Sequence, residues 1–307
     1  MSNKSAQKIM PCLWFIDQAE EAVNLYTSIF NNSKTGITTR YDEASAEASG
    51  RPEGSVLTIE FSLEGQSFLA LNAGPYTSFT PAVSFFVNCE TPIEVNGLWE
   101  KLSEGGSVLM ELDTYPFSKR FGWLMDKFGV SWQLNAGPRK QKISVCLMFV
   151  GKEHGKAEEA IRFYTSLFND SGILAIDRYE AGDNDVTGTI KHSVFNLHGQ
   201  EFMAMDSGLD HKFGFTPAVS LIVDCETQDE VDHFWNWFSE EGEIEQCGWL
   251  RDRYGVSWQI VPSILNELLI DPDPVKAQKV MQAMLKMKKL DIAVLKAAHA
   301  GTPAVPH

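Results

Sequence analysis

The residues best suited to acid–base or metal chemistry are unevenly distributed along this chain. All seven histidines lie in its second half. One of them, His211, follows Asp206 in an expected loop, and a carboxylate beside an imidazole can exchange protons or hold a metal ion weakly. The ordinary alternative is a loop carboxylate and a solvated imidazole. Three more histidines, on an expected strand, turn and helix, are interpreted as structural: His192, His198 and His233.

The five cysteines lack the spacing of a zinc site. Cys12 and Cys89 recur as Cys146 and Cys225 in apolar stretches, which predicts buried, reduced thiols that pack as small hydrophobic groups. Cys247 precedes Gly248-Trp249 and has no counterpart. A structural role is the simpler interpretation for it, and a place in a pocket wall is the alternative.

The chain is a tandem duplication. The string F-T-P-A-V-S-F-F-V-N-C-E-T at 79–91 returns as F-T-P-A-V-S-L-I-V-D-C-E-T at 215–227, an offset of 215 − 79 = 136 residues. A length of 307 residues suits two domains. We therefore predict one domain over residues 8–136, a second over 142–262, and a helical extension over 263–300.

Each copy predicts two consecutive units of one strand, one helix and three strands. In the first unit, strand 9–16 leads into a helix that Asp17 is expected to cap. A loop is expected at 42–54, and a hairpin turns at Glu64-Gly65. The second unit starts with strand 82–88 and a helix at 91–104. It ends at 122–134, whose twin at 248–260 has an offset of only 126 residues, so the first copy carries about ten extra residues.

The end of the chain departs from the repeat. Asp273-Pro274 and Asp291 are good helix starts, and the segment after Asp273 is rich in Ala, Met, Leu and Lys. A basic amphipathic helix sometimes binds membranes or a partner. In a chain of net charge −15 we expect it instead to pack on the same chain or on its mate in a homodimer.

Composition excludes several classes of partner. A pI near 4.9 argues against nucleic acid, because phosphate backbones need clusters of Lys and Arg. No apolar run reaches a membrane-spanning length and no apolar signal core follows the first residues. We therefore expect a cytoplasmic protein without a membrane partner.

Several motifs resemble one superfamily over essentially the whole chain. They are F-x-A-[LM]-[ND], F-T-P-A-V-S, V-[ND]-C-E-T, G-W-L-x-D, G-V-S-W-Q and the tail M-Q-A-M-L-K-M-K-K. Together with the paired units they resemble the vicinal oxygen chelate superfamily of glyoxalase I, extradiol dioxygenases and bleomycin-resistance proteins. The closer likeness is to its PhnB-like branch, often labelled 3-demethylubiquinone-9 3-methyltransferase. The resemblance implies an α+β fold: two tandem glyoxalase-like domains of paired βαβββ modules, each with a curved mixed sheet around a cavity, plus C-terminal helices.

The methyltransferase label does not suit these residues. Enzymes that use S-adenosylmethionine commonly need a parallel sheet whose first strand ends in a Gly-rich turn, and no G-x-G-x-x-G follows a strand here. We expect no cofactor.

The metal site of the superfamily is also expected to be missing. Aligned on the strand patterns, its positions are Met10, Asn72, Ala82 and Gln133 in the first copy, and Ser144, Asp206, Ala218 and Gln259 in the second. A hard divalent ion prefers carboxylates or imidazoles, and these sets contain one carboxylate.

Period-two alternation predicts which side chains line the cavities. The first copy contributes Met10, Cys12, Trp14, Asn72, Ser84, Phe86, Trp123 and Gln133. The second contributes Cys146, Met148, Asp206, Ser220, Trp249 and Gln259. Such walls suit a small, largely hydrophobic or planar ligand. The sequence leaves open whether each copy closes its own cavity or the copies exchange modules. Trp132 and Trp258, which alternate with these residues, are expected in the core.

Three functions remain open. The leading hypothesis is a small-molecule-binding member of the superfamily without the usual metal, whose catalytic residues are unknown and whose status as an enzyme is undecided. The alternatives are a metal-dependent lyase or dioxygenase with Asp206 and His211 as ligands, and a protein that sequesters a drug.

Overall fold

The computed structural model describes residues 7–303 and contains two eight-stranded mixed sheets. Sheet A has the order β14-β15-β16-β13-β1-β4-β3-β2, and sheet B has the order β10-β11-β12-β9-β5-β8-β7-β6. The strands of sheet A are β1 (Ile9–Phe15), β2 (Lys34–Arg40), β3 (Val56–Leu63), β4 (Gln66–Asn72), β13 (Val219–Cys225), β14 (Glu243–Ile244), β15 (Trp249–Arg251) and β16 (Ser257–Pro262). Those of sheet B are β5 (Val83–Cys89), β6 (Ser107–Tyr115), β7 (Ser118–Met125), β8 (Ser131–Ala136), β9 (Ile143–Val150), β10 (Gly172–Arg178), β11 (Ile190–Leu197) and β12 (Gln200–Ser207).

The two copies exchange modules. Strand β1 pairs antiparallel with β13, and β5 pairs antiparallel with β9. Each sheet therefore joins the first module of one copy to the second module of the other. The predicted order of one strand, one helix and three strands is confirmed in all four modules, but neither sheet is built from one copy alone.

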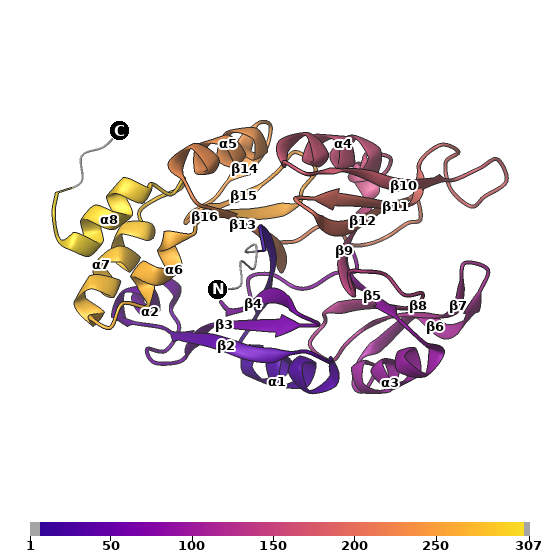
Figure 1. Ribbon diagram of the computed structural model, residues 1–307, viewed down its shortest axis with the longest axis horizontal. Helices are drawn as coiled ribbons and strands as arrows, with labels where there is room; N and C mark the ends of the chain where they lie inside the picture. The colour runs from indigo at the N-terminus through magenta and orange to yellow at the C-terminus, as the bar shows by residue number, and fades with distance from the viewer. Residues whose placement is uncertain (1–6, 304–307) are drawn as a thin grey trace.

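One helix per module covers the same face of each sheet. These helices are α1 (Ala19–Ile29), α3 (Pro92–Leu102), α4 (Ala157–Leu167) and α5 (Gln228–Ser239). In Figure 1, α1 and α3 lie along one side of the molecule and α4 and α5 along the other. Their apolar faces share one core with residues of both sheets, including Trp132 and Trp258, both 0% exposed. The expectation that these two tryptophans are core residues is confirmed.

Two local expectations are wrong. Asp17 does not cap α1: the N-cap residue is Gln18, and the amide of Ala19 donates instead to Asn72 Oδ1 at 2.9 Å. The expected loop at 42–54 contains a helix, α2 (Glu43–Ser49), which starts with a capping box between Asp42 and Ser45. A run of Ala, Glu and Ser has helix propensity that its polarity concealed.

The hairpin turns follow the prediction. Glu64 and Gly65 have φ values of 52° and 81°, and His198 and Gly199 have 49° and 75°. Two successive left-handed residues match the right-handed twist of the flanking strands. The turn at Glu64-Gly65 joins β3 to β4, and its twin joins β11 to β12.

The C-terminal segment, residues 263–303, packs on the same chain. It holds α6 (Ile264–Leu269), α7 (Pro274–Met284) and α8 (Ile292–Ala300), and its own apolar cluster includes Leu265, Val280, Leu290 and Leu295. Asp273 and Asp291 cap α7 and α8 as predicted. Within residues 7–303 no helix is long and apolar enough to cross a membrane.

Candidate functional site

The candidate sites lie on the face of each sheet that its module helices do not cover. We call this the concave face of the sheet. Figure 1 shows both sheets bent around this face. Strand alternation assigns its residues: in β1, Ile9, Leu13 and Phe15 join the helix-side core, so Met10, Cys12 and Trp14 lie on the concave side.

On each concave face a cysteine, a serine and a glutamine lie next to one another. On sheet A, Gln259 Nε2 donates to Ser220 Oγ at 2.9 Å, and Ser220 is paired across the sheet with Cys12. On sheet B, Gln133 Nε2 donates to Ser84 Oγ at 2.8 Å, and Ser84 is paired with Cys146. Both sites therefore combine residues of the two copies, and the side chains predicted for each cavity are regrouped accordingly.

These thiols are poor nucleophiles. Burial raises the pKa of Cys12 and of Cys146 to about 12. Hydrogen bonds with the neighbouring Gln and Ser lower the pKa, but their effect is smaller. A thiol reacts as its thiolate. The two cysteines therefore contribute shape and weak hydrogen bonding, not covalent chemistry.

Aromatic side chains differ between the two faces. On sheet A, Trp14 and Trp249 meet edge to face, with centroids 5.8 Å apart, and the Trp14 indole donates to the carbonyl of Gly74. On sheet B, Trp123 donates to Ser131 Oγ at 2.8 Å. The equivalent Ser257 Oγ on sheet A is buried without a hydrogen-bond partner in the described part of the chain.

Phe86 is central to the concave face of sheet B. Its ring centroid lies 6.1 Å from that of Phe121 on β7 and 6.2 Å from that of His192 on β11. Since β7 and β11 belong to opposite halves of the sheet, the two halves approach each other through Phe86. Cys146, Val194 and Met203 form a small apolar cluster beside it.

His192 was interpreted from the sequence as structural, yet it lies on this concave face. Burial lowers its pKa, so the imidazole is neutral at pH 7. Strand alternation would have found this position. His192 is two residues from Val194 and therefore shares its face of β11. Val194 is paired with Met203, and Met203 is paired with Cys146, which lies on the concave face.

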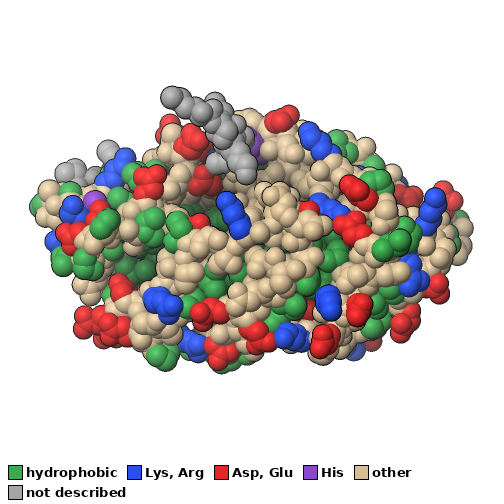
Figure 2. All heavy atoms as spheres, turned by 60° about the horizontal axis from the view of Figure 1, so that its bottom comes forward, with side chains coloured by type: hydrophobic (Ala, Val, Ile, Leu, Met, Phe, Trp, Pro, Cys, Tyr) green, Lys and Arg blue, Asp and Glu red, His purple; other side chains and the backbone are tan. Residues whose placement is uncertain are grey.

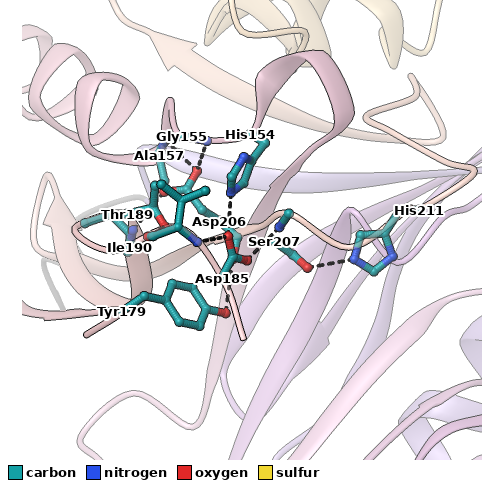
Figure 3. Close-up of polar contacts among 12 residues, drawn as sticks. His154, Gly155, Ala157, Tyr179, Asp185, Thr189, Ile190, Asp206, Ser207 and His211 are labelled. Carbon is teal, nitrogen blue, oxygen red and sulfur yellow. Dashed lines mark hydrogen bonds and ion pairs between the residues drawn. The ribbon is translucent and has the colours of Figure 1, made fainter. Parts of the chain in front are cut away.

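Asp206 and His211, the pair proposed for acid–base or metal chemistry, are not brought together. Asp206 faces α4 and accepts the amides of Gly155, Ala157 and Ile190 at 2.8, 3.2 and 2.9 Å. His211 pairs with Ser207 Oγ at 2.8 Å (Figure 3). A buried carboxylate at a helix N-terminus satisfies backbone donors, which explains its position.

Asn72 occupies the equivalent place in the first copy. Its Oδ1 accepts the amide of Ala19 at the start of α1, and its Nδ2 donates to the carbonyl of Val56. Both predicted cavity residues, Asn72 and Asp206, therefore face the helices instead. The other cavity residues of the prediction lie on the concave side: Met10, Cys12, Trp14, Ser84, Phe86, Trp123, Gln133, Cys146, Met148, Ser220, Trp249 and Gln259.

The metal of the superfamily does not fit the donors present. Of the eight aligned positions, Asn72 and Asp206 face helices and Ala82 and Ala218 have no donor atom. The rest offer a thioether, a hydroxyl and two amides, a poor set for a hard divalent ion. No group of three or more His, Cys, Asp or Glu is suitably placed to bind a metal within residues 7–303.

The two eight-stranded sheets of paired βαβββ modules have the glyoxalase-like fold, that of the vicinal oxygen chelate proteins. Each sheet curves around a face that carries residues of both copies. A family model described as 3-demethylubiquinone-9 3-methyltransferase matches residues 7–135 and 141–261, and the chain belongs to this family.

Two solved structures are similar to this chain. A putative 3-demethylubiquinone-9 3-methyltransferase, PhnB protein, from Bacillus cereus is 46% identical, over 42% of this chain and 98% of that one, with a TM-score of 0.39. Glyoxalase I from Zea mays is 11% identical over 86% of this chain and 98% of that one, with a TM-score of 0.53, a likeness of fold alone. No curated protein sequence gives a significant match.

Proposed function

We propose that this protein binds a small, planar, largely apolar molecule on a concave face, without the metal of its superfamily. The observation that carries this proposal is the position of Phe86 between Phe121 and His192. Phe86 and Trp123 are partly exposed on this face, so their rings are available to a ligand. Flat aromatic surfaces stack well on such rings.

Polar groups near these rings would orient the ligand. Gln133, the cross-strand neighbour of Phe86, is hydrogen-bonded to Ser84. The neutral imidazole of His192 can accept a hydrogen bond from a hydroxyl group. No hydrogen bond joins the His192 ring to any of residues 7–303. A phenol-like or enol-like ligand offers both a flat surface for the aromatic rings and a hydroxyl group for the His192 imidazole.

Methyl transfer is not supported by the fold. Both sheets are mixed rather than parallel, and no G-x-G-x-x-G pattern follows β1, β5, β9 or β13. The family description therefore names a chemistry for which these residues offer no recognisable cofactor site.

Titration with 2-naphthol, followed by tryptophan fluorescence and calorimetry, tests the proposal. Saturable binding is expected, and Phe86→Ala should weaken it at least fivefold through loss of ring contact. Trp237→Ala, at an exposed position on α5, is the matched control and should bind as the wild type does. A wild-type protein that shows no saturable binding of the probe contradicts the proposal.

The cellular location is part of the same proposal. All five cysteines are free thiols, and four are buried. Unpaired cysteines are usual in a reducing compartment, so we place the protein in the cytoplasm.

On one face, shown in Figure 2, acidic and basic side chains are interspersed and form no broad basic patch, which agrees with a small-molecule ligand rather than nucleic acid.

A further inference from the structure

A buried acceptor atom on the concave face of sheet B has no hydrogen-bond donor. Asn88 lies on β5 and is 1% exposed. Its neighbours Val87 and Cys89 belong to the helix-side core, so the side chain of Asn88 lies on the concave face, as that of Phe86 does. Its Oδ1 atom is buried without a partner among residues 7–303. Such an atom costs stability unless a donor reaches it.

The rest of the Asn88 carboxamide is held weakly. Its Nδ2 donates to the carbonyl of Gln141 at 3.4 Å, longer than the usual range of about 2.7–3.2 Å for this kind of bond. The main-chain amide of Asn88 is well bonded, because it donates to the carbonyl of Lys142 at 2.7 Å. The backbone is therefore fixed here, while the side chain lacks a strong partner.

A second acceptor on the same face also lacks a partner. The ring of His192 makes no hydrogen bond to any of residues 7–303, and in its neutral form it has one acceptor nitrogen. Burial and, to a smaller extent, the charge of Arg139 lower the pKa of His192, and the charge of Asp177 opposes them. The ring therefore stays neutral at pH 7 and keeps its acceptor.

The strand register places the two acceptors on opposite sides of one row of residues. Four side chains of the concave face form this row across β11, β12, β9 and β5: Val194, Met203, Cys146 and Ser84. Strands β5 and β11 run in the same direction, because two of the three pairings between them are antiparallel. His192 precedes the row on β11, whereas Asn88 follows it on β5. The acceptors therefore lie toward opposite ends of the concave face.

The ring of Phe86 lies between them. Its centroid is 6.2 Å from that of His192, and Asn88 is two residues further along the same strand, roughly 6.6 Å between Cα atoms. Phe86 is partly exposed, so a flat molecule can stack on its ring. A molecule stacked there has one acceptor toward each of its ends.

We propose that the ligand of sheet B carries two hydroxyl groups at opposite ends of a planar ring system, one donating to His192 and the other to Asn88. This inference rests on the proposed function and narrows its ligand class. Two hydroxyl groups on neighbouring carbon atoms do not fit, because they would reach only one of the acceptors.

Four naphthalene ligands test the inference on the wild-type protein. In 2,6-dihydroxynaphthalene a hydroxyl group stands at each end, whereas 2-naphthol has only one. In 6-methoxy-2-naphthol the second oxygen cannot donate, and in 2,3-dihydroxynaphthalene both hydroxyl groups are on neighbouring carbon atoms. By calorimetry we expect the 2,6-diol to bind at least fivefold more tightly than each of the other three, because only it satisfies both acceptors.

The possible outcomes separate this inference from the proposed function. If 2-naphthol binds but the 2,6-diol is no tighter than 6-methoxy-2-naphthol, the inference is wrong and the proposed function stands. A buried water that already donates to Asn88 would produce this result. The inference is equally wrong if the 2,3-diol binds most tightly. No saturable binding of any of the four ligands overturns both.

A variant assigns the second hydroxyl group to Asn88. Asn88→Leu replaces the carboxamide by an apolar group of similar shape, so the affinity for the 2,6-diol should fall to that for 2-naphthol, and 2-naphthol binding should change less than twofold. Asn24→Leu, at an exposed position on α1, is the control and should keep the fivefold preference.

The stability of the unliganded variant separates a binding role from a structural one. Because Asn88 Oδ1 has no partner in the free protein, the Tm of Asn88→Leu should not fall below that of the wild type. A lower Tm together with equal weakening of both ligands would show a structural residue and contradict the inference. If Asn88→Leu does not fold, the four ligands on the wild type still decide.

Discussion

The hydroxyl of Tyr164 donates a 2.7 Å hydrogen bond to Asp252, although the two residues belong to different sheets. Tyr164 lies on α4, which packs on β11 of sheet B, whereas Asp252 follows β15 of sheet A. The first copy repeats the contact as Tyr26 with Asp126 at 2.6 Å. Each copy thus keeps its own modules together through the helix side, while the sheets join it to the other copy.

Asp252 is held by four donors. Besides Tyr164, it accepts the indole of Trp258 at 2.9 Å and the amides of Tyr254 and Val256. These contacts explain the spacing of Asp252, Gly255, Trp258 and Gln259, a D-x-x-G-x-x-W-Q motif that Asp126 to Gln133 repeats. Its aspartate and its tryptophan are hydrogen-bonded to each other in the core, while its glutamine faces the concave side. The motif couples core and site because the two faces alternate along one strand.

Removal of the tyrosine hydroxyl should destabilise the fold. Tyr164→Phe leaves the buried carboxylate with one donor fewer, and the loss of a hydrogen bond to a charged group costs about 1.5–3 kcal/mol. Urea unfolding measures the change. Tyr76→Phe, at a tyrosine that is 76% exposed, is the control and should stay within about 0.5 kcal/mol of the wild type. Equal stability of both variants contradicts the expectation.

Stability should depend on pH through Asp252. Burial raises its pKa from the usual 3.8 to about 6. Since the folded-state pKa is the higher one, folding takes up a proton between these values, and the free energy of unfolding falls as pH rises through this window. A shift of roughly two units corresponds to about 3 kcal/mol. The unfolding free energy of the wild type minus that of Asp252→Asn should therefore decrease from pH 4 to pH 6.5. A value that stays constant over this range contradicts the prediction.

Exchanging the helix-start residues of the two copies should harm both. Asp206 accepts the amide of Ile190, so Asp206→Asn places an NH₂ group against another donor. Asn72 donates to the carbonyl of Val56, so Asn72→Asp places an oxygen against another acceptor. Each change should cost about 1–3 kcal/mol of unfolding free energy, as expected for a mispaired buried polar group. If either variant is as stable as the wild type, the assigned hydrogen bonds are wrong.

Divalent metals should not stabilise the protein. A metal present at 100 times its Kd would add about 2.7 kcal/mol to the stability of the folded state. We expect zinc, nickel, manganese and iron(II) to leave Tm unchanged, and Asp206→Ala to leave metal uptake unchanged. A stoichiometric metal in the purified protein, lost in Asp206→Ala, would instead favour metal-dependent chemistry.

The cysteines should differ in reactivity. Burial raises the pKa of the Cys12, Cys89, Cys146 and Cys225 thiols to about 12, and Cys247 is the one cysteine that is not fully buried. With a disulfide reagent at pH 8, at most one of the five thiols should react in the native protein, and all five in denaturant. Rapid labelling of Cys12 or Cys146 in the native state would show that their faces open to solvent.

Sequence alone determined the order of elements in the modules, the hairpin turns and the faces of the strands that carry Cys12 and Gln133. The repeat at 79–91 and 215–227 marked the modules, the Glu64-Gly65 turn marked the hairpin, and alternation placed Gln133 and Trp132 on opposite sides of β8. These features are local, because strand period, turn conformation and helix capping depend on residues close together in the chain.

Tertiary structure decided which modules share a sheet. Because β1 and β9 are equivalent strands of the two copies, β5 has a matching partner in each, and no local pattern distinguishes them; the structure pairs β5 with β9. That choice grouped Ser84 and Gln133 with Cys146. Likewise Asp206 lies toward α4, where it accepts the amides of Gly155 and Ala157 at the helix start, about 50 residues away in the sequence. Partners so distant in sequence are selected by packing of the whole chain.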